Sequence, residues 1–235
     1  MSFRAATGAA YGVALLLTLG CGGGTRPPRA TLGPETNSGD AIRFEDLPVT
    51  RLSRDRVPQP NAANPSQGTV NAPVVIQVWS DFECPFCADM QPVLAELLEA
   101  YAGRVRLVWH DYPLPFHAHA RLAANVGREA YAQGGASAFW KFHDAVYASA
   151  PESGQLTAGK LGEFGKQAGL DDVRLQTALT TSRHDAEITA DVNSGNAIGV
   201  EGTPAFLVND YFFVGSVPLE IMRVIVDRAL SDAGP

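Results

Sequence analysis

Cysteines and cationic residues are scarce in this sequence, and a membrane-length apolar run is absent. Only three of its 235 residues are cysteines, and 18 Lys and Arg stand against 25 Asp and Glu, which gives a formal net charge of -7. This acidic balance, without a cluster of cations, argues against nucleic acid as a partner. The apolar run from residue 9 to residue 19 is shorter than the about 20 residues that a helix needs to cross a bilayer. The chain length and its 46% hydrophobic content suit one domain with a real core and are tight for two.

The apolar run instead has the length of the hydrophobic region of a signal peptide, and one basic residue, Arg4, precedes it. The run ends in Leu-Thr-Leu-Gly followed by Cys21, which resembles a bacterial lipobox. The resemblance implies that residues 1–20 are a signal peptide and that Cys21 becomes lipidated. An ordinary secretory signal and an uncleaved anchor are the alternatives. All three export the chain to a compartment where disulfides persist, so we expect a lipid-anchored protein on the periplasmic side of a bacterial membrane.

Residues 21–68 are rich in Gly, Pro, Thr, Asn and Ser, and most of the segment shows no apolar periodicity. This composition predicts a flexible tether that holds a domain away from the membrane surface. The less polar stretch 41–52 predicts at most a short edge strand. We therefore place the folded domain at residues 69–235.

The domain begins with a strand, a helix and a second strand. Val74 to Trp79 is a nearly continuous apolar run, which is typical of a strand buried on both faces. Apolar residues then recur at helical spacing from Met90 to Tyr101, and an alternating strand pattern follows at residues 104–110. This order predicts a βαβ unit with parallel strands.

A helical block follows, and a second β-containing segment closes the chain. Residues 116–198 show no strand pattern and predict five helices, at 118–133, 138–150, 158–168, 171–180 and 183–197. Two apolar runs, 205–208 and 211–214, are joined by Asn209-Asp210, which indicates a hairpin, and an amphipathic helix follows at 218–230. We predict an α/β fold in which one mixed sheet holds four strands and the helical block is inserted between the βαβ and ββα halves.

With Cys21 assigned to the lipid, Cys84 and Cys87 remain as an isolated Cys-Pro-Phe-Cys pair. Pro85 fits the first position of a helix, which makes Cys84 the N-cap. The Cys84 sulfur then lies near the free backbone N–H groups of Phe86 and Cys87, where a thiolate is stabilised and the pKa falls. Cys87 is one turn further in and should be more buried. The spacing predicts an exposed nucleophile, Cys84, and a resolving thiol, Cys87. For Phe86, contact with apolar substrate segments and packing at the helix start are equal alternatives.

The sequence resembles DsbA-like thiol–disulfide oxidoreductases of the thioredoxin superfamily. The resemblance rests on the runs VVIQVWSDFECPFC, DYPLPFHAHARLAANVGREAYAQGGASAFWKFHDAVY and EGTPAFLVN, within a match from about residue 70 to the end. It implies a thioredoxin fold with an inserted helical domain, in which Cys84 attacks and Cys87 resolves. It also implies that Pro204 is a cis-proline against the active-site disulfide, and that Thr203 presents its backbone to an extended substrate. A trans turn before a strand is the alternative for Gly202-Thr203-Pro204.

One position departs from the family pattern. Many thioredoxin-like proteins carry a buried acid six residues before the first cysteine, where this chain has Val78. Proton transfer at Cys87 then needs another route, through Asp81, Glu83 or water. The two acids equally fit a loop that faces solvent, and as negative charges near Cys84 they would raise its pKa.

We therefore expect an enzyme, a protein disulfide oxidoreductase, whose direction of exchange the sequence leaves open. It needs no cofactor beyond the Cys84–Cys87 redox disulfide, and its partners are cysteine-containing exported proteins and a membrane redox partner. A zinc site that combines the cysteines with His117 and His119 is disfavoured by the wide spacing, so we expect no metal. The alternative function is a redox-silent envelope lipoprotein that binds polypeptides and keeps the cysteine pair as a structural disulfide.

Overall fold

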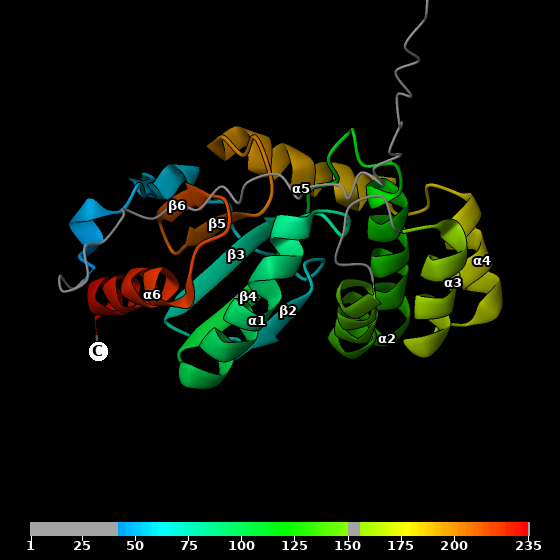
Figure 1. The fold of residues 1–235 in the computed structure, drawn as a ribbon, viewed down its shortest axis with the longest axis horizontal. Helices are drawn as coiled ribbons and strands as arrows, with labels where there is room; N and C mark the ends of the chain where they lie inside the picture. The colour runs from blue at the N-terminus through cyan, green and yellow to red at the C-terminus, as the bar shows by residue number, and fades with distance from the viewer. Residues whose placement is uncertain (1–41, 150–155, 235) are drawn as a thin grey trace, which may run out of the picture.

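A six-stranded mixed sheet forms the centre of the part of the chain that the computed structural model describes, residues 42–149 and 156–234 (Figure 1). The predicted signal peptide, the predicted lipidation site Cys21 and the other residues up to 41 lie outside the described residues. The strands lie in the order β1-β6-β5-β3-β4-β2. Their bounds are β1 Thr50–Arg51, β2 Ser66–Gly68, β3 Val74–Ser80, β4 Val105–Asp111, β5 Ala205–Val208 and β6 Tyr211–Val214.

The βαβ unit is confirmed at the middle of the sheet. Strands β3 and β4 pair in parallel, and helix α1, Pro85–Ala100, connects them. Strand β5 pairs antiparallel with β3 and forms a hairpin with β6. Asn209 turns this hairpin with φ 53°, a left-handed conformation that Asn tolerates better than most residues. Its side chain also accepts a hydrogen bond from the Val75 N–H at 2.9 Å, so the turn is tied to the central strand.

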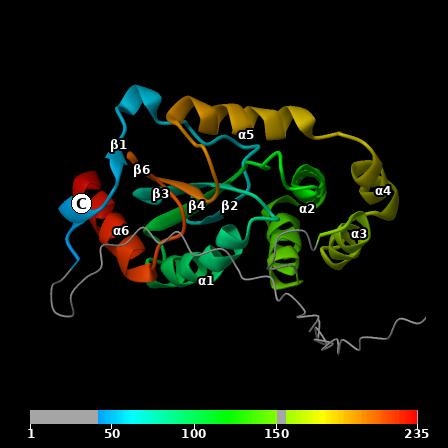
Figure 2. The same ribbon diagram turned by 45° about the horizontal axis from the view of Figure 1, so that its top comes forward.

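Helices cover both faces of the sheet, which explains the apolar run of β3. Helices α1 and α6, Leu219–Ala233, lie on one face, and α5, Asp185–Ile198, lies on the other (Figure 2). Val74, Ile76 and Val78 belong to the main core, whereas Trp79 packs in a smaller cluster with Ile198 at the end of α5. Each face of β3 therefore meets its own apolar layer. No helix within the described ranges is both long and apolar enough to cross a membrane.

The predicted helical insertion is confirmed between β4 and β5. Helices α2, Ala120–Ser149, α3, Ala158–Gln167, and α4, Asp172–Thr180, form a lobe beside the sheet, and α5 returns the chain across it (Figure 2). The two helices expected at 118–133 and 138–150 are one element, α2, broken at Gly134 and Gly135. Gly135 has φ 61°, which a residue with a side chain would adopt only at a cost.

The predicted tether over 21–68 is wrong from residue 42 onward. The short helices η1, Phe44–Asp46, and η2, Arg54–Arg56, accompany β1 and β2, and these two strands pair with β6 and β4 at the two edges of the sheet. The edge strand expected within 41–52 is β1, and the sheet has six strands instead of four. Leu47 and Leu52 are buried. Composition misses this segment because its partners lie far away in sequence and each strand is only two or three residues long.

A buried ionic cluster joins the insertion to the sheet. The Arg128 guanidinium of α2 donates to Asp111 at the end of β4 at 2.5 Å, to Asp191 of α5, and to the Ala63 carbonyl at 2.5 Å. His110 pairs with the second Asp191 oxygen at 2.9 Å. Burial would raise the pKa of Asp191, but His110 and Arg128 together lower it. The cluster therefore holds β4, α2 and α5 in one arrangement with the N-terminal segment, the described residues that precede β3.

Candidate active site

The two cysteines lie where β3 ends and α1 begins, and they are not joined by a disulfide in this structure. Cys84 is the N-cap of α1 with an extended backbone, φ -79° and ψ 119°, and Pro85 occupies the first helical position. The Cys87 N–H donates to the Cys84 carbonyl at 3.1 Å, which closes the first turn. The N-cap prediction is confirmed.

Cys84 is not exposed, contrary to the prediction from the helix start. Only 3% of its surface and 1% of that of Cys87 is accessible. The loop that precedes β5 covers it, and the Cys84 thiol donates to the Thr203 carbonyl oxygen at 3.3 Å. The Thr203–Pro204 peptide bond is cis, as the family resemblance implies. The cover comes from a segment more than a hundred residues away, so the local helix pattern could not show it.

Cys84 and Cys87 differ in the acidity of their thiols. The pKa of Cys84 is lowered to about 6, first by a hydrogen bond from the Cys87 side chain, then by the Thr203 side chain and the backbone N–H groups of Cys87 and Phe86, against the effect of burial. The Thr203 hydroxyl has no partner among the described residues, so it is free to donate to a thiolate. At neutral pH, Cys84 is therefore mostly a thiolate, and the hydrogen bond to the Thr203 carbonyl belongs to its protonated form.

Cys87 has the opposite property. Burial raises its pKa well above 9, and the adjacent Cys84 charge raises it further. The Ser80 side chain and the Asp81 backbone act in the other direction, because both hydrogen-bond the Cys87 sulfur. One cysteine is thus a ready nucleophile and leaving group, while the other is a protonated thiol until it is needed.

The two acids beside the cysteines turn inward and do not face solvent. Asp81 is 1% exposed and Glu83 is 2% exposed. Asp81 accepts hydrogen bonds from the Glu83 N–H at 2.7 Å, the Leu114 N–H at 2.7 Å and His117 Nδ1 at 2.8 Å. Asp81 therefore anchors the loop between β4 and α2 against the cysteines.

Both loop histidines lie beside these acids. The His117 hydrogen bond to Asp81 raises the pKa of the imidazole above 6.5, and the charges of Asp81, Cys84 and Glu83 add to this effect. Glu83 accepts from the His119 N–H at 2.5 Å, while its other oxygen, 3.9 Å from His119 Nδ1, has no hydrogen-bond partner. Across the described residues, no group of three or more His, Cys, Asp or Glu side chains is arranged to hold a metal ion.

A family model described as Thioredoxin matches residues 61–228, which is most of the chain. The chain belongs to this family. Among solved structures, BdbD from Bacillus subtilis superposes with a TM-score of 0.66 at 22% identity, over 72% of this chain and 94% of BdbD. A thioredoxin-like oxidoreductase from Silicibacter pomeroyi gives a TM-score of 0.63 at 27% identity, over 72% of this chain and 93% of that one. With its inserted helical domain, the chain is a DsbA-like member of the thioredoxin superfamily.

Curated relatives of this thioredoxin-family chain carry two kinds of name. Disulfide bond formation protein D of Bacillus subtilis is 24% identical over 171 residues, which cover 71% of this chain and 77% of that protein. Na(+)/H(+) antiporter NhaA 3 of Salinispora tropica is 34% identical over 168 residues, which cover 71% of this chain. The chain spans about a quarter of the length of that antiporter relative.

The thioredoxin-family site also contains two hydroxyl groups that were not identified from the sequence. Ser80 ends β3, and its Oγ lies 3.1 Å from the Oη of Tyr147 on α2. Tyr147 also donates to the Asp81 carbonyl at 3.1 Å. The position of Ser80 four residues before Cys84 was visible in the sequence, but its partner comes from the far end of a 30-residue helix. Only the packing of the insertion brings the two together.

Two aromatic side chains near the cysteines of the thioredoxin-family site are at least partly accessible. Phe86 is half-buried between the cysteines, so its role in substrate contact stays a prediction. Phe116, on the loop that Asp81 anchors, is 76% exposed. The site therefore has an aromatic side chain in water next to the histidine that interacts with Cys84.

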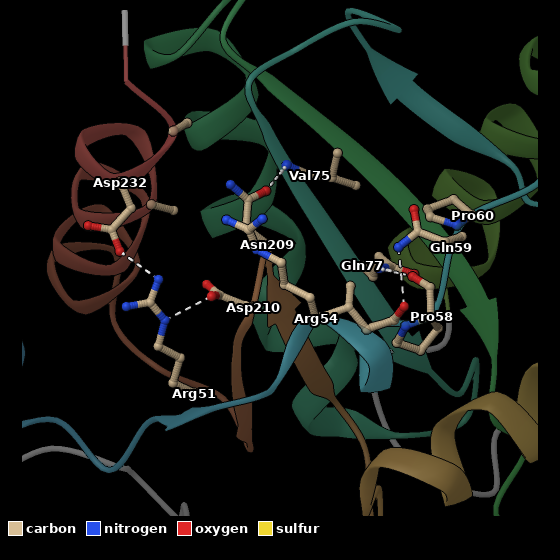
Figure 3. A pocket seen from close by; sticks show the side chains of 13 residues that line it. Arg51, Arg54, Pro58, Gln59, Pro60, Val75, Gln77, Asn209, Asp210 and Asp232 are labelled. Atoms are coloured by element: carbon tan, nitrogen blue, oxygen red, sulfur yellow. Dashed lines mark hydrogen bonds and ion pairs between the residues drawn. The ribbon is translucent and has the colours of Figure 1, made fainter.

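A separate pocket of about 410 Å³ lies at the other end of β3 and does not include the cysteines (Figure 3). Figure 3 shows Arg51 between Asp210 and Asp232, and Gln77 bonded to the Pro58 carbonyl. Both carboxylates that face Arg51 are thus already paired. The thiol chemistry of this thioredoxin-family chain belongs to the opposite end of the sheet.

Proposed function

We propose that the protein is an exported, lipid-anchored thiol–disulfide oxidoreductase that exchanges disulfides with cysteine-containing proteins through Cys84 and Cys87. The observation that carries the proposal is the opposed acidity of two buried cysteines at one helix start, with the pKa of Cys84 lowered to about 6 and that of Cys87 raised. A static disulfide needs neither shift. Opposed pKa values are what a thiol pair needs to form and then resolve a mixed disulfide.

The exchange follows from this arrangement. In the oxidised protein, a substrate thiolate attacks the Cys84 sulfur, the Cys84–Cys87 bond breaks, and Cys87 leaves and takes up a proton. A second substrate thiolate then attacks the substrate sulfur of the mixed disulfide, and Cys84 leaves as a thiolate. Substrate gains a disulfide and the pair becomes a thiolate and a thiol. The low pKa of Cys84 makes it a good leaving group and stabilises the reduced form, so we propose that the protein oxidises its substrates.

The substrate would lie along the loop that covers Cys84. Thr203 precedes β5, is 9% exposed, and its carbonyl oxygen lies 3.3 Å from the Cys84 sulfur. An extended peptide that pairs with the Thr203 backbone would place its own sulfur at Cys84. Phe86 and the exposed Phe116 would give such a peptide apolar contacts.

Export and lipidation rest on the sequence of residues 1–21. Two names among similar proteins agree with this proposal: a Bacillus subtilis relative is called disulfide bond formation protein D, and a Salmonella enterica structural neighbour is described as a periplasmic thioredoxin-like protein. A membrane redox partner would restore the disulfide after each turnover.

The deciding experiment measures the redox equilibrium of the Cys84–Cys87 pair in glutathione buffers and the oxidation of a reduced test protein. We expect a potential well above about -300 mV, the range of structural disulfides, and loss of activity in Cys84→Ser. Cys21→Ser is the matched control: it should leave exchange intact and release the protein from the membrane fraction. Full activity in Cys84→Ser, or a potential below that limit, would contradict the proposed enzyme and favour the redox-silent lipoprotein.

A further inference from the structure

Few groups around Cys87 can stabilise its thiolate form. It is 1% exposed, and burial raises its pKa well above 9. Val78, two residues before the end of β3, offers no charge or proton at this depth. When the Cys84–Cys87 disulfide is restored after a turnover, the resolving step nevertheless requires Cys87 to attack as a thiolate.

A pair of buried hydroxyl groups lies on the Cys87 side of β3. Ser80 is 2% exposed and Tyr147 is 7% exposed. The Tyr147 O–H donates to the Asp81 carbonyl at 3.1 Å, so the Ser80 O–H donates to the Tyr147 oxygen at 3.1 Å. The Ser80 side chain also lowers the pKa of Cys87 through hydrogen bonding, which indicates that the sulfur lies near its hydroxyl. Its hydroxyl therefore has two acceptors within reach, one phenol oxygen and one sulfur.

We propose that Ser80, held in place by the Tyr147 hydroxyl, is a positioning residue that supports Cys87 as a thiolate in the resolving step. The proposal rests on the proposed function. While Cys87 is a thiol, the Ser80 proton lies on the Tyr147 oxygen. When Cys87 loses its proton, Ser80 turns its O–H from the Tyr147 oxygen to the sulfur, and the Tyr147 O–H turns from the Asp81 carbonyl to the Ser80 oxygen. The number of hydrogen bonds is unchanged, but the one to the thiolate is charge-assisted and therefore stronger.

The step is balanced without an external oxidant. With a substrate or glutathione on Cys84, the Cys87 thiolate attacks the Cys84 sulfur, a Cys84–Cys87 bond forms, and the bond to the substrate breaks. The substrate leaves as a thiolate and takes up the proton that Cys87 lost. Ser80 and Tyr147 keep their protons throughout, so the pair stabilises the thiolate by hydrogen bonding and is unchanged at the end of the step.

The groups around the hydroxyl pair come from three elements. Cys84 begins α1 and adds negative charge, and Asp81 follows Ser80 with its carboxylate turned to the β4–α2 loop. From α2, the His143 ring lies 4.9 Å from that of Tyr147, and burial lowers the pKa of His143. His117, on the loop between β4 and α2, has a raised pKa, but it is hydrogen-bonded to the Asp81 carboxylate and interacts with Cys84, and it is not among the groups that act on Cys87. Cys87 is therefore supported by donation from hydroxyl and backbone N–H groups.

The role of the insertion follows from the origin of Tyr147. The cysteines and Ser80 belong to the βαβ unit, whereas Tyr147 is on α2, near the end of the long helix. The inserted lobe therefore contributes to the resolving cysteine from inside the core, in addition to any contact with substrate.

The test is a rapid-mixing experiment on the reduced full-length protein with glutathione disulfide, followed by acid quench and mass spectrometry. A first phase, which depends on glutathione disulfide concentration, reports attack by Cys84; a second phase, which does not, reports resolution by Cys87. We expect Ser80→Ala to slow the second phase about fivefold and to move its pH midpoint upward by about one unit, with the first phase unchanged.

Three further variants separate this role from a structural one. Ser80→Thr keeps the hydroxyl and should restore the second phase to near the original rate. Tyr147→Phe should slow it about twofold, whereas Tyr131→Phe, which removes a hydroxyl bonded to the Ala62 carbonyl from the same helix, should change neither phase. Original rates and an unshifted pH midpoint in Ser80→Ala would overturn the proposal. Absence of both phases in the unmodified protein would instead refute the proposed function.

Discussion

The lowered pKa of Cys84 makes the stability of the reduced protein depend on pH in a defined window. A thiol whose folded-state pKa lies at about 6, against 9.0 in the unfolded chain, contributes stability above pH 9 and loses it as the pH falls through 6. A shift of this size corresponds to about 4 kcal/mol at its full extent. Between pH 6 and pH 8, the linkage relation gives a gain of about 2 kcal/mol in the free energy of unfolding.

The measurement is urea denaturation of the reduced protein at pH 6 and pH 8, beside the Cys84→Ser variant. The variant keeps every other titrating group, so the difference between the two proteins isolates Cys84. The oxidised protein has no thiolate and should follow the variant. We expect the advantage of the unmodified reduced protein to grow by about 2 kcal/mol from pH 6 to pH 8. The reasoning is refuted if both proteins change equally with pH, or if alkylation of Cys84 shows a midpoint near 9.

Three other perturbations test the surroundings of the site. Arg128→Met leaves two buried carboxylates without the arginine that pairs with them. It should lower the free energy of unfolding, measured by urea denaturation, by about 3–5 kcal/mol. A change below about 1 kcal/mol would contradict a stabilising role of the ionic cluster. Asp81→Asn removes the main cause of the raised pKa of His117, so the imidazole resonances in NMR should titrate closer to about 6.5; an unmoved midpoint would show that Asp81 is not the cause. Gly195→Ala places a methyl group 2.8 Å from the Trp79 ring and should destabilise the protein by about 1–3 kcal/mol; an unchanged melting temperature would show that α5 can shift.

Features with a local cause could be predicted from the sequence. The apolar run of β3, the helical spacing of α1 and the Asn209-Asp210 turn each depend on neighbouring residues, and the structure has all three. The position of Cys84 as the N-cap follows from Pro85 in the same way.

Features that depend on residues far away in the sequence could not be predicted in this way. Cys84 is buried by Thr203, and Asp81 turns inward because His117 and the backbone at Leu114 offer it hydrogen bonds. Ser80 gains its partner from α2. In each case the residue type was visible, but its neighbour was set by tertiary packing. The two acids, for which a loop facing solvent was one alternative, are buried and anchor the β4–α2 loop, while a role in proton transfer at Cys87 stays a prediction.

The pairing of β1 with β6 has a consequence for synthesis of the chain. Thr50 leaves the ribosome early, yet its partner Phe212 follows about 160 residues later, so the outer edge of the sheet closes only when nearly the whole chain is available. Contacts of such long range form slowly because a large loop must first be ordered. Without β6 the edge of β5 is free, and without β1 the edge of β6 is free; a free edge of this kind recruits other strands. A chain halted before β6, or cut between the N-terminal segment and β3, would therefore be the form most prone to aggregate.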